Sequence, residues 1–229
     1  MKKLLSLIMA LGLTLSLIGC GSKGPEILGT YDTKFDIKDM LVEQVDSQMG
    51  LDVSLGDYVE SFDVAVVYEF KEDGTYSQNI DMDAFEASFE NLKAALVPYM
   101  ENVFVSAFRD QIVAVDPTAV IESVEDIESF LGMTFDEIMI QSVGMDFESF
   151  VNVVMDESMP LDDLQNDAQS EGKYKAEGGK LYMSESLDTD INESAYEVYT
   201  IKGNVVTVTE GVNIESNDIV SYPFELIKR

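Results

Sequence analysis

The oxygen-bearing side chains of Asp188, Asp190 and Asn192 have a spacing that could hold a metal ion. Alternating acidic and amide side chains supply the first ligands of a common type of calcium-binding loop. The rest of that pattern is missing, because Glu193 stands where the loop needs glycine and Tyr199 where it needs glutamate. Asp and Asn are also frequent turn residues between strands. We therefore name the first three residues as a candidate calcium site, with an ordinary turn as the alternative.

Ser170 and Lys173 have the spacing of a serine nucleophile and its lysine base in one class of serine enzymes. That chemistry needs the serine at the start of a rigid helix with the lysine one turn further on. Here the two residues enter a predicted strand through Gly172, and the partner motifs Ser-Asp-Asn and Lys-Thr-Gly are missing from the sequence. The spacing is therefore interpreted as a coincidence.

The composition of the 229 residues excludes several further chemistries. The chain has no His, which removes Ser-His triads, Cys-His dyads and His-ligated zinc sites. Its single Cys excludes internal disulfides and cysteine-cluster metal sites. A formal charge of −30 argues against a nucleic-acid partner, because phosphate binding needs clustered Lys and Arg. The sequence predicts a protein that is not an enzyme and names calcium alone as a cofactor candidate.

The first residues of the chain have the pattern of an export signal. Lys2 and Lys3 precede a short apolar stretch that ends in Leu17-Ile18-Gly19-Cys20. This ending resembles the lipobox of bacterial lipoproteins. The resemblance implies that residues 1–19 are a cleaved signal peptide and that Cys20 carries palmitate-type acyl chains. Residues 20–26 would then be the lipidated Cys and its tether, and the protein would lie at the extracytoplasmic face of the cell membrane.

The residues that follow the tether carry strand and helix signals in separate stretches. Residues 29–31 predict a short strand, and apolar residues at helical spacing predict a helix over residues 35–49. Residues 64–70 and 75–80 are apolar or alternating and flank the turn at 71–74, which predicts a β-hairpin.

The middle of the chain, about residues 81–170, predicts a helical insertion. Apolar residues from Phe85 to Val103 recur in alternating steps of four and three, as on the buried face of a helix. Pro98 lies within this stretch, and proline removes a backbone donor, so we expect it to kink or break the helix.

Two short repeated segments within the insertion predict helix boundaries. Gly132 and Gly144 are expected to end helices, because glycine adopts the left-handed conformation of a helix C-terminus. Thr134 and Asp146 follow two residues later and are expected to cap the next helices.

The last part of the chain predicts strands. They are expected at residues 172–176, 180–184, 197–201, 205–209 and 223–227. With the front strands they number about seven or eight, enough for a small barrel or a strongly curved sheet. The sequence therefore predicts an α+β fold, a small antiparallel β-barrel or curved sheet with a helical insertion.

Four short motifs resemble lipocalin-like lipoproteins of Gram-positive bacteria. They are Gly29-Thr30-Tyr31, Asp73-Gly74-Thr75-Tyr76, Gly172-Lys173-Tyr174 and the segment from Tyr199 to Gly203. The resemblance implies that residues 27–229 form a lipocalin-like β domain around the insertion at about 81–170. It implies a fold and a location but no reaction.

Two functions remain open at this point. In the first, the barrel binds a small apolar ligand, since a barrel of about eight strands can hold one. In the second, the acidic middle binds a basic protein partner, because residues 110–172 contain 16 acidic residues and no Lys or Arg. The alternative to this second function is a solvated helix exterior without any partner.

Overall fold

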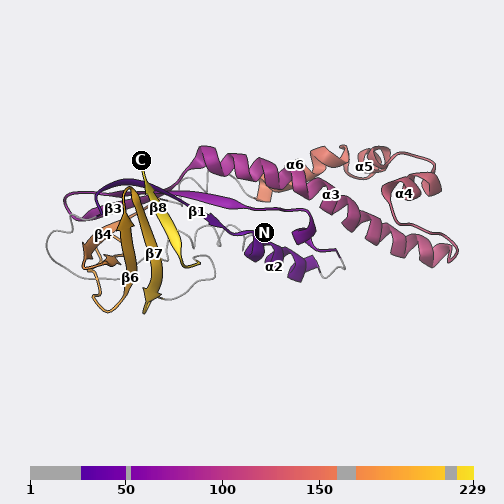
Figure 1. Cartoon of the computed structure of the whole chain (residues 1–229). Coiled ribbons are helices and arrows are strands. Elements are labelled where there is room, and N and C mark those ends of the chain that lie inside the picture. Colours follow the sequence, from indigo (N-terminus) through magenta and orange to yellow (C-terminus); the bar gives the residue numbers. More distant parts are fainter. Residues whose placement is uncertain (1–26, 50–52, 159–168, 215–220) are drawn as a thin grey trace. The chain divides into compact units, whose positions relative to one another are not determined.

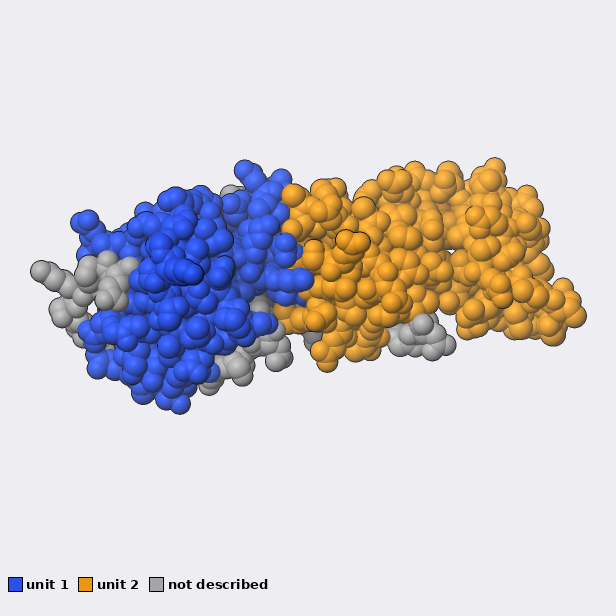
Figure 2. All heavy atoms as spheres, in the orientation of Figure 1, with its two compact units in different colours: residues 1–37, 63–86, 160–229 blue, residues 38–62, 87–159 orange. Residues whose placement is uncertain are grey.

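A computed structural model describes residues 27–49, 53–158, 169–214 and 221–229. The predicted signal peptide 1–19, the lipidation at Cys20 and the tether 20–26 lie outside these residues. The chain forms two compact units (Figure 2), each built from separate stretches. Unit 1 contains residues 1–37, 63–86 and 160–229, and unit 2 contains residues 38–62 and 87–159.

Unit 1 is a closed antiparallel β-barrel of eight strands (Figure 1), which confirms the predicted fold class. The strands are β1 (Gly29–Asp36), β2 (Asp63–Phe70), β3 (Thr75–Ile80), β4 (Ser170–Glu177), β5 (Lys180–Met183), β6 (Tyr196–Lys202), β7 (Val205–Val212) and β8 (Phe224–Lys228). Each strand pairs with the next along the chain, and β1 pairs with β8 to close the barrel.

The barrel forms because side chains alternate between its interior and its surface along each strand. In β2 the interior row is Val64, Val66, Tyr68 and Phe70, all buried. Burying one such apolar side chain stabilises the folded state by about 1.5–3 kcal/mol. The barrel interior is therefore the hydrophobic core of unit 1.

The two ends of the barrel differ in their connections. At one end, here called the turn end, short turns join β2 to β3, β4 to β5 and β6 to β7. At the other, here called the loop end, the chain makes its longer connections, at residues 37–62, 81–169, 184–195 and 213–223.

Five aromatic rings pack together near the turn end. The ring of Phe70 lies 5.9 Å from Tyr31, 6.0 Å from Tyr68, 6.3 Å from Tyr76 and 4.9 Å from Tyr174, measured between centroids. All five residues are buried, so this part of the interior is occupied by the protein's own side chains.

Unit 2 is helical, and two of its short helices begin and end at capping residues. The helices of the chain are α2 (Lys38–Met49), the 3₁₀ turn η1 (Leu55–Asp57), α3 (Met82–Val115), α4 (Val124–Leu131), α5 (Phe135–Val143) and α6 (Phe147–Ser158). Thr134 caps α5 with a reciprocal bond to Glu137, and Gly132 and Gly144 end α4 and α5 in the left-handed conformation. These predicted boundaries are confirmed. None of the helices in the described ranges is both long and apolar enough to cross a bilayer.

Unit 2 also contains a cluster of aromatic rings. The ring of Phe104 on α3 lies 6.1 Å from Phe135, 5.6 Å from Phe147 and 6.3 Å from Phe150. These edge-on contacts join α3 to the first turns of α5 and α6. Because helices this short are only marginally stable alone, packing against α3 stabilises them.

One local prediction was wrong. Phe35 was assigned to a helix, but it is a strand residue of β1 that pairs with Val64 of β2. Its side chain continues the buried row of Tyr31 and Thr33, so tertiary pairing overrides the helical spacing. Of the kink or break expected at Pro98, the break does not occur: α3 runs through Pro98, whose carbonyl accepts a hydrogen bond from the Asn102 side chain.

Candidate functional site

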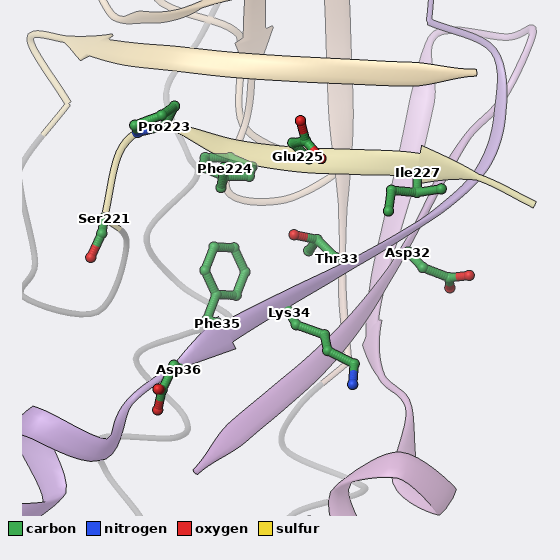
Figure 3. A pocket seen from close by; sticks show the side chains of 10 residues that line it. All are labelled: Asp32, Thr33, Lys34, Phe35, Asp36, Ser221, Pro223, Phe224, Glu225 and Ile227. Atoms are coloured by element: carbon green, nitrogen blue, oxygen red, sulfur yellow. The ribbon is translucent and has the colours of Figure 1, made fainter. Parts of the chain in front are cut away.

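A cavity of about 490 Å³ lies at the seam between the first and last strands of the barrel (Figure 3). β1 and β8 are paired at Tyr31–Lys228 and Asp32–Ile227, near the turn end. The cavity, here called the seam cavity, lies further toward the loop end. Its lining residues are Asp32, Thr33, Lys34, Phe35, Asp36, Ser221, Pro223, Phe224, Glu225 and Ile227.

The seam cavity has an apolar floor and a charged rim. The buried rings of Phe35 and Phe224 both line it and contact each other edge-on, with centroids 5.3 Å apart (Figure 3). Lys34 and Glu225 belong to the alternate, exposed positions of the same strands. The volume of the cavity lies within the range of small-molecule sites, about 300–1,000 Å³, which combine apolar surface with polar groups that orient the ligand.

A carboxyl group lies inside the barrel at the start of β6. Glu197 is 3% exposed, and its Oε1 accepts a hydrogen bond of 3.0 Å from the hydroxyl of Tyr222. Burial raises the pKa of Glu197 to about 7, although the bond from Tyr222 opposes the rise. This carboxyl group therefore changes its charge near neutral pH.

Gly211 gives Tyr222 the room to reach this carboxyl group. It pairs with Glu197 across β6 and β7, and a Cβ placed on it would lie 2.6 Å from the Tyr222 hydroxyl oxygen. Any side chain at this position would displace the hydroxyl, so the glycine and the hydrogen bond belong together.

Two further hydroxyl groups lie in the barrel interior, on strands β2 and β4. Tyr68 and Ser170 both stand opposite Gln78 on the adjacent strands β2 and β4. The hydroxyls of Tyr68 and Ser170 are buried and have no hydrogen-bond partner in the described part of the chain. Burial is the main cause that raises the pKa of Tyr68, and the charge of Glu197 raises it further. The ionisation of Tyr68 and the charge of Glu197 are therefore electrostatically coupled inside the barrel.

A run of aromatic contacts connects the buried carboxyl group to the seam cavity. Tyr222, which donates to Glu197, lies between two lining residues, Ser221 and Pro223. Its ring is 5.7 Å from that of Phe224, which lines the cavity. We call Glu197, Tyr222, Tyr68 and the seam cavity together the barrel site.

The candidate calcium residues lie in the loop between β5 and β6. Asp190 forms an ion pair of 3.5 Å with Lys173, and Asn192 accepts bonds from the backbone and hydroxyl of Ser194. Asp188 is exposed. Within the described residues no group of three or more His, Cys, Asp or Glu side chains is arranged to hold a metal ion. The loop contacts found here are those of an ordinary turn.

Ser170 and Lys173 lie on strand β4 rather than at the start of a helix. The side chain of Lys173 forms the ion pair with Asp190, and its backbone nitrogen donates a hydrogen bond to the hydroxyl of Ser184. Because the two residues are three positions apart on one strand, their side chains lie on opposite faces of the sheet.

Unit 2 contains a second, acidic hollow of about 850 Å³. Its polar lining includes Glu101, Glu128, Asp136, Asp146 and Glu148. Burial raises the pKa of Glu101, and the charges of Glu125 and Asp136 add to the rise. Part of this acidity is structural, because Glu128 and Asp136 accept bonds from the backbone nitrogens of Phe135 and Phe147.

Sequence reasoning missed Glu197 and Tyr222. The available signal was the alternation of strand β6, in which Glu197 stands two residues before the buried Tyr199 and so faces inward. The comparisons with known proteins add no site residues: no protein-family model, curated protein or solved structure matches this chain.

Proposed function

We propose that the chain is a non-catalytic lipoprotein whose barrel binds a small, mainly apolar ligand at the extracytoplasmic face of the cell membrane. The observation that carries the binding function is the seam cavity, in which Phe35 and Phe224 present buried rings to a space of about 490 Å³. The five-ring cluster fills the interior near the turn end, so the ligand would enter where β1 and β8 separate.

Binding is tested with N-phenyl-1-naphthylamine, a probe that becomes fluorescent in apolar sites. The purified Cys20→Ala protein is expected to bind it saturably, because the lipid anchor contributes nothing to the cavity. Phe35→Ala should weaken binding, since it removes one wall of the cavity. Ile201→Ala is the matched control, because Ile201 is an exposed barrel residue outside the cavity. Equal binding by Phe35→Ala and wild type would contradict the seam site.

Anchoring is proposed from the lipobox-like ending at Cys20, the single cysteine of the chain. Several acyl chains on one residue hold a protein firmly at a membrane surface. Cys20→Ala is expected to move the protein from the membrane fraction to the soluble fraction of the cells that express it. Retention of the variant in the membrane fraction would rule out the lipid as the anchor.

The acidic hollow of unit 2 favours a second candidate function, a scaffold that binds a basic protein partner. Glu101 carries a raised pKa because it is partly buried among other carboxylates, and a cationic partner would relieve this repulsion. Binding of a lysine-rich peptide at low ionic strength is expected to weaken in Glu101→Gln. The control is Glu86→Gln, an exposed position outside the hollow. A peptide affinity that changes neither with ionic strength nor in Glu101→Gln would exclude this candidate.

A further inference from the structure

We propose that the barrel site selects amphiphiles that carry a protonated primary amine, with Glu197 as the counter-ion of the amine inside the barrel. The inference rests on the proposed ligand-binding function and names the chemical class of the ligand.

The first argument is the absence of a protein cation at this carboxyl group. None of the ion pairs that Lys and Arg form within the described residues includes Glu197. A buried carboxylate without a cation is costly, and proteins normally pair such a group or leave it on the surface. A ligand cation would complete the site in the way that a lysine does elsewhere.

The second argument is the unused hydrogen-bonding capacity around the carboxyl group. A carboxylate has about four acceptor positions, and Tyr222 fills one of those on Glu197. Tyr68 is 1% exposed, and its hydroxyl has no hydrogen-bond partner within the described chain. The charge of Glu197 contributes to the raised pKa of this tyrosine. A primary ammonium brings three donors and no acceptor, so it suits a carboxylate and a hydroxyl oxygen together.

The third argument is the apolar surface beside the carboxyl group. Tyr222 donates a hydrogen bond to Glu197, and its ring contacts Phe224. Phe224 in turn contacts Phe35, and both rings line the seam cavity. An amphiphile could place its head group at Glu197 and its hydrocarbon chain against the two phenylalanines. An anionic amphiphile would meet a like charge here, and a neutral one would leave the carboxylate without a cation.

The test compares three ligands that share one hydrocarbon chain: dodecylamine, dodecanol and dodecanoate. Each is titrated below its micelle concentration against N-phenyl-1-naphthylamine bound to the Cys20→Ala protein at pH 8. We expect dodecylamine to bind about tenfold or more tightly than dodecanol, the usual scale of a hydrogen bond to a charged group, and dodecanoate to bind most weakly. Glu197→Gln should remove the preference for dodecylamine and leave dodecanol binding unchanged.

One further variant and a second pH keep the test decisive. Glu210→Gln removes an exposed carboxylate of β7 that does not line the seam cavity and should keep the preference for the amine. The wild-type barrel, as the Cys20→Ala protein, is also titrated at pH 5, where the Glu197 carboxyl group is protonated and the preference for dodecylamine should be lost, so the test does not depend on the folding of Glu197→Gln.

The outcomes separate this inference from the function on which it rests. Equal affinity for dodecylamine and dodecanol at pH 8, a preference that persists in Glu197→Gln, or a loss of the preference in Glu210→Gln overturns the inference and leaves ligand binding intact. Failure of the probe and of all three ligands to bind overturns both.

Discussion

The hydroxyl of Tyr222 donates a 3.0 Å hydrogen bond to Glu197 and lies directly over Gly211, the cross-strand partner of that glutamate. The bond joins the segment before β8 to the first residues of β6 inside the barrel. Gly211, Tyr222 and Glu197 thus form one polar cluster beside an aromatic core. Its charge state and geometry lead to measurable consequences.

The stability of the protein should fall as the pH rises from about 4.5 to 7 through the action of Glu197. Its folded-state pKa of about 7 lies above the ordinary value of 4.5, so in this interval the folded state binds more protons than the unfolded state. The neighbouring Tyr68, Tyr76 and Tyr222 have raised pKa values and stay uncharged there. The penalty above pH 7 is on the order of 3 kcal/mol.

Glu197→Gln is therefore expected to be more stable than wild type at pH 8 and to lose this advantage at pH 4.5. Urea unfolding at both pH values measures the difference. The control is Glu210→Gln, an exposed glutamate of β7, which should give the same small effect at both. A constant difference between Glu197→Gln and wild type would show that the carboxyl group does not titrate in this interval.

Gly211→Ala should disconnect Tyr222 from Glu197. The added Cβ would lie 2.6 Å from the hydroxyl oxygen and force it away, so Glu197 loses the donor that holds its pKa down. We expect the pKa of Glu197 to rise further, measured by NMR titration of its side-chain carboxyl group. Tyr222→Phe removes the same hydrogen bond without a clash and should cause a similar rise. A pKa that is unchanged in both variants would contradict this role of the tyrosine.

Phe70→Ala should destabilise the barrel without disturbing the seam cavity. Phe70 is buried and contacts four other rings, and truncation of such a residue costs about 3–5 kcal/mol. Ile201→Ala, at an exposed position, should change the free energy of unfolding by about 0.5 kcal/mol or less. Chemical denaturation measures both. Affinity for the fluorescent probe should persist in Phe70→Ala under conditions in which the variant is folded, and a loss would place the ligand at the turn end.

Loss of the helix caps should weaken unit 2. Ser123 and Thr134 each accept a bond from a backbone nitrogen in the first turn of α4 and α5, and replacing such a cap by Ala costs about 1 kcal/mol. Ser123→Ala and Thr134→Ala are each expected to lower the thermal midpoint followed by far-ultraviolet circular dichroism. Ser129→Ala, within α4 and exposed, is the control and should leave the midpoint unchanged or slightly higher. A similar loss in all three would argue against capping.

The hairpin of β2 and β3 could be predicted because its signals are local. Apolar residues flank the turn, and Asp73 accepts bonds from the backbone and hydroxyl of Thr75, as the Asp-Gly motif favours. The caps Thr134 and Gly144 were predicted for the same reason, since each depends on residues within one helical turn.

Phe35 shows where such reasoning fails. Its spacing to the following apolar residues fits a helix, but its pairing with Val64 decides its conformation, and that partner is 29 positions away in sequence. The barrel site was beyond prediction for a related cause. Glu197 and Tyr222 are 25 residues apart, and their contact exists only when β6, β7 and β8 have adopted one register. An acidic residue in a strand is normally placed on the surface, so composition argues against the interior position that it occupies.

The pairing of β1 with β8 determines when during folding the barrel can close. Every other strand pair of the barrel joins consecutive strands, whereas this one joins the first strand to the last. Contacts between distant parts of a chain form slowly, because the intervening loop must close first. During synthesis the helices can form from neighbouring residues, but the seam cavity comes into existence only once β8 has been made and docked. A truncated or half-folded chain would therefore lack the cavity, and ligand binding would report that the whole barrel has been assembled.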